Sequence, residues 1–440
     1  MERRNVWADR GFIHVLGPTP ALTPGGKGDW DGGVLESSGV FKDGNTYYWY
    51  YHAWSADEKL WPSGYRVGVA TAPTPLGPWR KYEKNPILDH GPRGSWDDSW
   101  VACAVVLKEG AYDIKGGTEK YYMFYSASGS GSETVDIGLA VADNPLGPWR
   151  KYEKNPIVED FGYLGGVVKV GGKFYMYTEH PIGVTDQGPF CIAVADRPEG
   201  PWKKYEGNPI LKPGDWGSWD DGGFSEAGVT YRDGVFHVFY GGTKTTKLES
   251  VGYAYSFDGY NFIKYPGNPV IDRAKIPDCS ALAEVHHLIE PPYIYVFHTL
   301  RYISRGGEDL AVQVLVPTGI PFKISYPILS LEGVEAGGVG ELKNCLPVSL
   351  EHASTLALTT ECTYSRDAKA GVRVHVRSSP DGLDYDTVDL YSFDVDYKPG
   401  KTVRKTVGLK TEAKFIKVIV ENLDSENAIP RVNITATVGG

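Results

Sequence analysis

Cysteine is scarce in this 440-residue chain, and none of its five cysteines stands in a CxxC pair. Zinc-ribbon and thioredoxin-like motifs need that spacing and are therefore excluded. Cys345 and Cys362 are close enough in the sequence to pair with each other, but we expect all five cysteines to be buried thiols.

Long apolar runs and clusters of basic residues are also missing. A membrane-spanning helix needs about 20 consecutive apolar residues, and no stretch approaches that length. The formal net charge is -10, and no Lys/Arg run interrupts the acidic balance. We therefore expect neither a membrane nor a nucleic acid as partner, whereas the oligomeric state stays open.

The first residues, MERRNVWADRGF, lack the apolar segment of a secretory signal peptide. As given, the chain is expected to be cytoplasmic. It would be secreted or periplasmic if a leader had been trimmed from it.

One segment recurs along the first three quarters of the chain with little change. GPWRKYEKNPIL becomes GPWRKYEKNPIV, GPWKKYEGNPIL, GYNFIKYPGNPVI and finally the weaker GIPFKISYPIL. Regular recurrence at this spacing is typical of propellers, solenoids and arrays. The copies fill Gly77–Leu88, Gly147–Val158, Gly200–Leu211, Gly259–Ile271 and Gly319–Leu329.

The segments between the copies have the pattern of β-strands. An apolar stretch, a tight DG or GG turn and an aromatic run precede each copy, as in GVTYRDGVFHVFYGG, and a third apolar stretch follows the aromatic run. No helical periodicity is convincing. Four strands per unit and five units predict an all-β chain with a five-bladed β-propeller over residues 1–329. The N-terminal GFIHVLGPTPAL resembles a partial extra copy that would help to close the ring.

From residue 330 the repeat stops, and segments such as VRVHVRSSPDGLDYD and KFIKVIVEN alternate apolar and polar residues. This alternation predicts a C-terminal antiparallel β-sandwich over residues 330–440. It holds no cluster of chemically suggestive side chains. We expect it to stabilise the protein as an accessory domain rather than to bind sugar.

Tryptophan–aspartate pairs stand just ahead of three of the predicted inner strands. Inner strands of a propeller converge on a central channel, whose mouth is the natural ligand site. The pairs would then bring acids and rings to one mouth, although an Asp at such a place also serves to cap a turn. The pairs, with the acids that follow two of them, are Trp30–Asp31, Trp96–Asp97–Asp98 and Trp219–Asp220–Asp221.

Glu226 breaks the symmetry of the blades. It occupies an inner-strand position held by Ser37 in the first blade and Cys103 in the second. Structure alone does not require an acid in one blade. A carboxyl group close to others has its charged form disfavoured and its pKa raised, as a general acid requires.

Loops after the second strands, the fifth inner strand, and Glu36 beside Ser37 of the first inner strand add polar and aromatic groups at the same mouth. Such groups suit the recognition of a hydroxylated ring, and we expect them to bind substrate. They are Glu36, His52, Trp54, Glu179, His180, Lys244, Glu284, His286 and Arg301.

Over residues 30–330 the outer-strand and hairpin motifs resemble the five-bladed glycoside hydrolases of family 43 and their relatives in families 32, 117 and 130. The resemblance implies an exo-acting, inverting arabinofuranosidase or xylosidase. It also implies an Asp base in blade one, an Asp modulator in blade three and a Glu acid in blade four. Glu226 matches the acid, whereas Ser37 and Leu164 stand where the two Asp residues should be.

The sequence is therefore interpreted as an exo-acting, inverting glycoside hydrolase for plant- or algal-type oligosaccharides. Glu226 would be the acid, Asp31 the base and Asp97 the modulator. A phosphorylase similar to family 130 is an alternative, with Arg301, Lys244 and His180 for phosphate, and a non-catalytic sugar-binding propeller is another. No cofactor is expected to be required, and a calcium or sodium ion is allowed for in the central channel.

Overall fold

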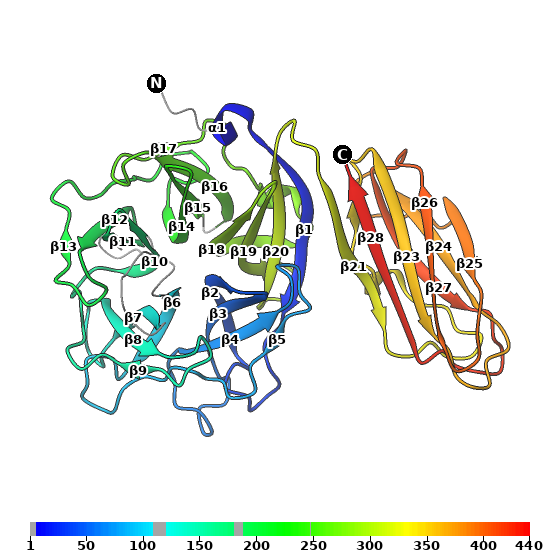
Figure 1. The fold of residues 1–440 in the computed structure, drawn as a ribbon, viewed down its shortest axis with the longest axis horizontal. Helices are drawn as coiled ribbons and strands as arrows, with labels where there is room; N and C mark the ends of the chain where they lie inside the picture. The colour runs from blue at the N-terminus through cyan, green and yellow to red at the C-terminus, as the bar shows by residue number, and fades with distance from the viewer. Residues whose placement is uncertain (1–5, 109–119, 180–187, 247) are drawn as a thin grey trace. The chain divides into compact units, whose positions relative to one another are not determined.

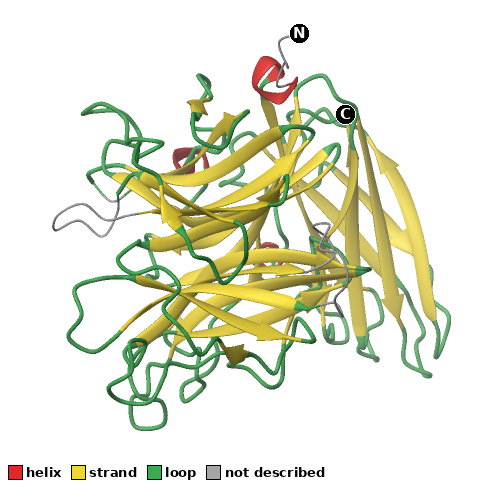
Figure 2. Ribbon diagram, turned by 60° about the vertical axis from the view of Figure 1, so that its left-hand side comes forward, coloured by secondary structure: helices red, strands yellow, loops and turns green. Residues whose placement is uncertain are grey.

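The computed structural model describes residues 6–108, 120–179, 188–246 and 248–440, and their regular secondary structure is almost entirely β-strand (Figure 2). Within those ranges the helices are α1 (Val6–Arg10) and two 3-10 turns, Arg273–Lys275 and Leu342–Asn344. None of the described helices has the length and apolar character needed to cross a membrane. The predicted all-β class is confirmed.

The chain divides into two compact units, unit 1 (Met1–Leu315) and unit 2 (Val316–Gly440). The strands of unit 1 fall into five sets of four, numbered here in chain order. Set 1 contains β2 (Val34–Asp43), β3 (Thr46–Trp54), β4 (Arg66–Ala72) and β5 (Arg80–Lys81). Set 2 contains β6 (Trp100–Lys108), β7 (Tyr121–Ser128), β8 (Asp136–Ala142) and β9 (Arg150–Lys151). Set 3 contains β10 (Tyr163–Val170), β11 (Lys173–Glu179), β12 (Phe190–Ala195) and β13 (Lys203–Lys204).

Sets 4 and 5 share one eight-stranded sheet, because β14 and β18 pair in parallel at Ala227 and Val285. Set 4 contains β14 (Gly223–Arg232), β15 (Val235–Thr243), β16 (Glu249–Ser256) and β17 (Ile263–Lys264). Set 5 contains β18 (Cys279–Glu290), β19 (Tyr293–Tyr302), β20 (Glu308–Pro317) and β1 (Phe12–Leu22). The first strand of each set lies toward a common centre (Figure 1).

The outer strand of set 5 comes from the beginning of the chain. β1 pairs with β20, so the segment GFIHVLGPTPAL closes the last set, as its sequence suggested. The assignment of 319–329 to the propeller was wrong, because β21 (Lys323–Leu331) pairs with β28 (Arg431–Gly439) in unit 2. The division between the units therefore falls before that segment and not after it.

Unit 2 consists of two four-stranded antiparallel sheets, in whose central strands buried side chains alternate with partly exposed ones. One sheet has the order β21, β28, β23 (Thr355–Thr363) and β26 (Thr402–Leu409). The other has the order β22 (Val348–Ser349), β27 (Phe415–Asn422), β24 (Val372–Ser379) and β25 (Tyr391–Val395). All five cysteines of the chain are free and buried, as predicted.

The asparagine of the repeated NP dipeptide fastens the end of each copy to the third strand of its set. Asn85 accepts a hydrogen bond from the Val69 backbone N–H and donates one to the Val69 carbonyl, both at 3.0 Å. Asn155, Asn208 and Asn268 do the same in sets 2, 3 and 4. This part of the repeat is scaffold, because it satisfies buried backbone groups.

His298 on β19 predicts a dependence of stability on pH. Its Nδ1 donates to the Thr299 carbonyl (3.1 Å), its Nε2 accepts from the Gln313 amide (2.9 Å), and burial lowers its pKa to about 4. Between pH 6.5 and 4 the unfolded state takes up more protons at this residue, so stability falls as the pH falls. From pH 7 to pH 5 the loss should be about 2 kcal/mol.

Urea unfolding at the two pH values checks this. His298→Gln should lose less stability than the unchanged chain over that interval. His352→Gln, at an exposed histidine, should lose as much as the unchanged chain. Equal losses for all three proteins would contradict the assignment.

Candidate active site

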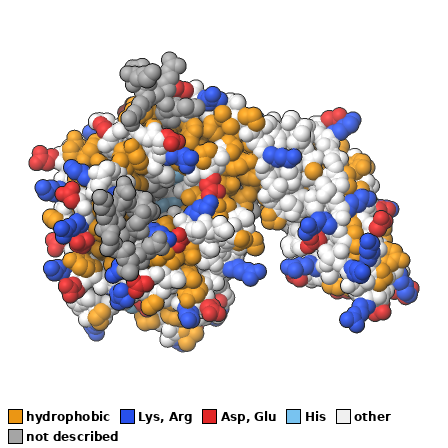
Figure 3. Space-filling view, viewed as in Figure 1, with side chains coloured by type: hydrophobic (Ala, Val, Ile, Leu, Met, Phe, Trp, Pro, Cys, Tyr) orange, Lys and Arg blue, Asp and Glu red, His pale blue; other side chains and the backbone are white. Residues whose placement is uncertain are grey.

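A cavity of about 1040 Å³ is lined by residues from all five sets. Figure 3 shows a hollow in unit 1 with histidine at its floor and acidic and basic groups beside it. Among the described lining residues, two permanent cations, Lys244 and Arg301, face an excess of carboxyl groups. The carboxyl groups are those of Glu36, Glu179, Asp221, Glu226, Glu249 and Glu284.

An irregularity in the inner strand of each set turns side chains into this cavity. Each inner strand departs from regular pairing, between Ser37 and Val40 in β2 and at corresponding points in the other four. Bulges of this kind re-aim side chains and are frequent beside active sites. Two non-glycine residues there have positive φ angles, Cys103 (52°) and Glu284 (46°). The backbone is strained at these points, which fixes where their side chains lie.

The strand registers make one inner-strand position equivalent in all five sets. Val40, Val106, Val167, Val229 and His287 pair with corresponding residues of the second strands. The residues three positions earlier are Ser37, Cys103, Leu164, Glu226 and Glu284. Two of the five sets thus supply a carboxyl group at this position, and both groups line the cavity.

Glu36 lies at the centre of a network of charges. Its Oε1 accepts a hydrogen bond from Arg301 at 2.6 Å, and its Oε2 lies 3.1 Å from His52 Nε2. Burial raises the pKa of Glu36, but its interactions with His52 and Arg301 outweigh this effect and bring the pKa down to about 2. Glu36 is therefore a carboxylate at neutral pH.

Arg301 holds further acids in place besides Glu36. It donates to Glu284 at 3.0 Å and lies 3.7 Å from Glu308. Glu308 in turn accepts from the Leu35 backbone N–H at 3.1 Å, next to Glu36 on β2. The charge of Glu284 raises the pKa of Arg301, which stays protonated. Arg301 thus joins set 5 to set 1 at the cavity wall.

Glu226 has the opposite environment to Glu36. It is 9% exposed, and its Oε1 accepts a hydrogen bond from Cys103 Sγ at 3.0 Å. Burial raises the pKa of Glu226, against the lowering effects of His52 and Cys103. Two carboxyl groups of one cavity therefore have pKa values displaced in opposite directions, as an acid and its charged partner need.

Two pairs of stacked aromatic rings also line the cavity. Trp54 stacks on Tyr65 with ring centroids 5.5 Å apart and an angle of 8° between the planes. Trp100 stacks on Tyr163 at 5.9 Å and 15°. Sequence reasoning named only Trp54. Trp100 and Tyr163 are the first residues of two inner strands. Because inner strands are expected to start at the mouth of the channel, their positions in the sequence could have identified them.

The three aspartates of the tryptophan–aspartate pairs do not line this cavity, and their predicted place at the mouth was wrong. Each is almost fully buried against a lysine of the outer strand of its own set. The ion pairs join Lys81 to Asp31 (2.6 Å), Lys151 to Asp97 (2.5 Å) and Lys264 to Asp220 (2.6 Å). The lysines belong to the repeated GPWRKY segment and its variants. We call each lysine–aspartate ion pair, together with the tryptophan that precedes the aspartate, a clamp, and the three of them the clamp.

The tryptophans of the clamp pack inside their sets. Trp30, Trp96 and Trp219 each lie against a tyrosine of the second strand, with centroids 5.6, 5.9 and 5.7 Å apart. A glycine of the third strand leaves room for both rings, because a Cβ at Gly68 would lie 2.7 Å from Trp30 and from Tyr51. Set 3 has no such tryptophan, and there Thr178 and Cys191 replace the tyrosine and the glycine.

The other predicted residues divide as follows. Glu36, His52, Trp54, Glu179, Asp221, Lys244, Glu226, Glu284 and Arg301 line the cavity. Asp98 lies outside it and caps an exposed loop by accepting from the Gly94 N–H, and His286 is buried against Gly228. His180 lies outside the described residues. Cys103 and Glu249, which were not predicted to bind, also line the cavity.

No protein-family model matches this chain, and no curated protein matches it. Among solved structures, it is similar to the BT0996 RGII complex with 16% identity and a TM-score of 0.53, over 70% of this chain and 93% of that one. It has the fold of the propeller glycoside hydrolases.

The likeness to two further propeller glycosidases extends into both units. The Bombyx mori GH32 β-fructofuranosidase BmSUC1 is 12% identical, with a TM-score of 0.51, over 96% of this chain and 93% of that one. The Schwanniomyces occidentalis β-fructofuranosidase complexed with fructosyl-erythritol is 10% identical, with a TM-score of 0.50, over 95% and 97%. At these identities the likeness establishes the fold, and the chemistry has to be argued from the cavity.

Proposed function

We propose that this protein is an exo-acting glycoside hydrolase in which Glu226 is the general acid and Glu36 the charged carboxylate. The five sets are the blades of a five-bladed propeller, and unit 2 is a β-sandwich. The observation that carries the proposal is the pair of carboxyl groups in one cavity, one buried beside a thiol and the other held ionised by Arg301 and His52. Glycoside hydrolysis needs such a pair.

In this mechanism Glu226 protonates the leaving oxygen of the glycosidic bond. Glu36 replaces Asp31 as the base that activates water, and its charge also favours the cationic transition state. Arg301 and His52 position Glu36. The stacked rings Trp54–Tyr65 and Trp100–Tyr163 offer flat faces to the C–H groups of sugar rings. We propose inversion, and plant- or algal-type arabinofuranosides or xylosides as substrates.

The phosphorylase alternative is less favoured by the cavity. A phosphate site needs several cations, whereas Arg301 already binds Glu36 and Glu284. Of the permanent cations in the described lining, this leaves Lys244. A sugar-binding protein without catalysis would use the same aromatic rings, so a measurement of turnover is needed to distinguish it from a hydrolase.

The test is turnover of a panel of aryl arabinofuranosides and xylosides, with and without phosphate. We expect release of the aryl group in phosphate-free buffer, and a product of inverted anomeric configuration by NMR. Turnover that requires phosphate would replace the hydrolase by the phosphorylase. Binding of sugar without turnover of any glycoside would leave a binding protein.

A further inference from the structure

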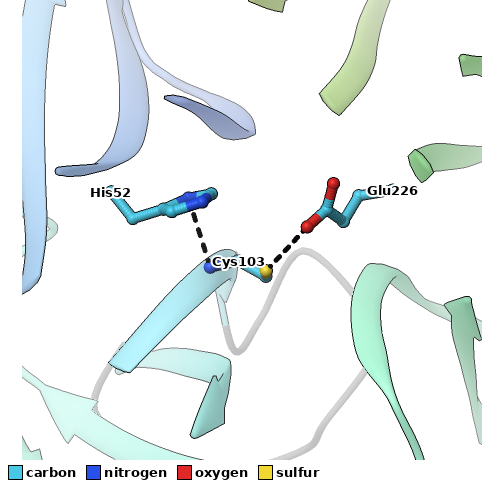
Figure 4. Close-up of side chains that lie close together, drawn as sticks. All are labelled: His52, Cys103 and Glu226. Atoms are coloured by element: carbon cyan, nitrogen blue, oxygen red, sulfur yellow. Dashed lines mark hydrogen bonds between the residues drawn. The ribbon is translucent and has the colours of Figure 1, made fainter. Parts of the chain in front are cut away.

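Three side chains from three different sets meet at the floor of the cavity with a nitrogen, a sulfur and an oxygen. His52 comes from β3, Cys103 from β6 and Glu226 from β14, and Figure 4 shows them pointing toward one another. Their candidate ligand atoms all lie within 4.8 Å of one another. The three residues are 3%, 1% and 9% exposed, so water competes little for these atoms.

The network around His52 leaves one of its ring nitrogens available as a lone-pair donor. Glu36 Oε2 lies 3.1 Å from Nε2, and an oxygen of a carboxylate accepts a hydrogen bond, so Nε2 is the nitrogen that donates. Nδ1 faces the Cys103 backbone N–H at 3.5 Å, which is a long contact, and the Ser38 hydroxyl at 2.9 Å, which is free to rotate. A histidine whose second nitrogen donates to a carboxylate is the usual arrangement around a metal ion.

The donor set selects the class of ion. Calcium and sodium, allowed for in the channel from the sequence, prefer oxygen ligands, whereas thiolate with imidazole favours zinc and similar ions. Zinc at about 2.0–2.3 Å from each ligand needs ligand atoms about 3.5 Å apart. Cys103 Sγ and Glu226 Oε1 are already 3.0 Å apart. Small side-chain shifts therefore complete the site.

Charge and access agree with a cation at this place. All three residues line the cavity, which gives an ion a route in and room for water as a fourth ligand. The described lining carries six carboxyl groups and the two permanent cations Lys244 and Arg301, which favours an additional positive charge. On binding, a divalent ion takes the place of the proton on the Cys103 thiol and of the proton on the Glu226 carboxyl group. Both protons leave to solvent.

We propose that His52, Cys103 and Glu226 form a binding site for a zinc-type divalent ion, and that the bound ion inhibits the enzyme by occupying the carboxyl group of its acid. The inhibition rests on the proposed function. The binding site does not depend on it.

Binding is tested first, with zinc and cobalt chloride on the full chain. We expect equilibrium dialysis to give one ion per chain, and the cobalt complex to show a thiolate-to-cobalt charge-transfer absorption. Cys103→Ala should remove that absorption and weaken zinc binding at least about 100-fold, since a ligand is lost. Cys362→Ala, at a buried cysteine of unit 2, should bind as the unchanged protein does. Failure of the unchanged protein to bind, or a cobalt complex without thiolate absorption, would overturn the site even if Cys103→Ala does not fold.

Inhibition is tested with any glycoside that the unchanged protein turns over. Zinc should inhibit the unchanged protein and Cys362→Ala equally, and a chelator should restore their rates. Cys103→Ala, measured against its own metal-free rate, should be resistant. A protein that binds zinc through Cys103 but is not inhibited refutes the inhibitory role. If the protein binds zinc but turns over no glycoside, the proposed metal site stands and the proposed hydrolase function is refuted.

Discussion

Glu226→Gln is expected to lower kcat about 10³-fold on glycosides with poor leaving groups, since general acid catalysis contributes on the order of 10²–10⁴-fold. The amide cannot supply a proton. Its oxygen still accepts the hydrogen bond from Cys103, so the fold and the urea midpoint should be unchanged. Steady-state kinetics and urea unfolding of the same preparation check both halves of the expectation.

Glycosides with different leaving groups distinguish loss of the general acid from general damage to the active site. A glycoside whose leaving group needs no protonation should be hydrolysed by Glu226→Gln at a rate close to that of the unchanged enzyme. Asp97→Asn is the matched control, because its carboxyl group faces Lys151 and lies outside the cavity lining. Its folded fraction should keep the full kcat. Full activity of Glu226→Gln, or inactivity of folded Asp97→Asn, would refute this assignment of the acids.

Lys151→Met is expected to cost about 3 kcal/mol of unfolding free energy, because breaking a buried ion pair by removing one partner leaves the other charge uncompensated. Asp97 is 2% exposed and loses its partner on β9. The lysine side chain is 28% exposed, so water offsets part of the cost and keeps it at the lower end of the range for buried pairs. Urea unfolding followed by tryptophan fluorescence measures the loss.

The neighbouring residue of the same strand supplies the control. Arg150 lies 3.9 Å from Asp143, and both side chains are more than 60% exposed. Arg150→Met should therefore change stability by less than about 0.5 kcal/mol. Equal losses of unfolding free energy for the two variants would mean that the clamp stabilises the protein no more than an ordinary surface ion pair does.

Much of unit 1 was predictable because its local patterns repeat. Turn dipeptides between apolar and aromatic runs predicted the hairpins, and the recurring GPWRKY segment predicted the outer strands. The tryptophan–aspartate pairs were recognised, but their role was not. The lysine that binds Asp31 is 50 residues further along the chain, and only the packed set shows that the two meet.

The site was predictable where symmetry breaks. Glu226 stood out because the first two sets place Ser37 and Cys103 at the equivalent position, but the acid is not confined to one set, since set 5 places Glu284 there. Glu36 was recognised as a substrate-binding group but not as the charged carboxylate. Its lowered pKa depends on His52 of β3 and on Arg301 of β19, which is distant in sequence. Cys103 was passed over because nothing in its neighbourhood along the chain shows that a bulge directs its side chain toward Glu226.

The pairing of β1 with β20 has a consequence for the order of assembly on the ribosome. β1, the outer strand of set 5, is made first, and its partner β20 is among the last parts of unit 1 to emerge. Until then β1 presents an open hydrogen-bonding edge, to which a nascent neighbour on the same messenger can attach. The interval between the synthesis of Phe12 and that of Pro317 is thus the period in which this protein is most exposed to mispairing.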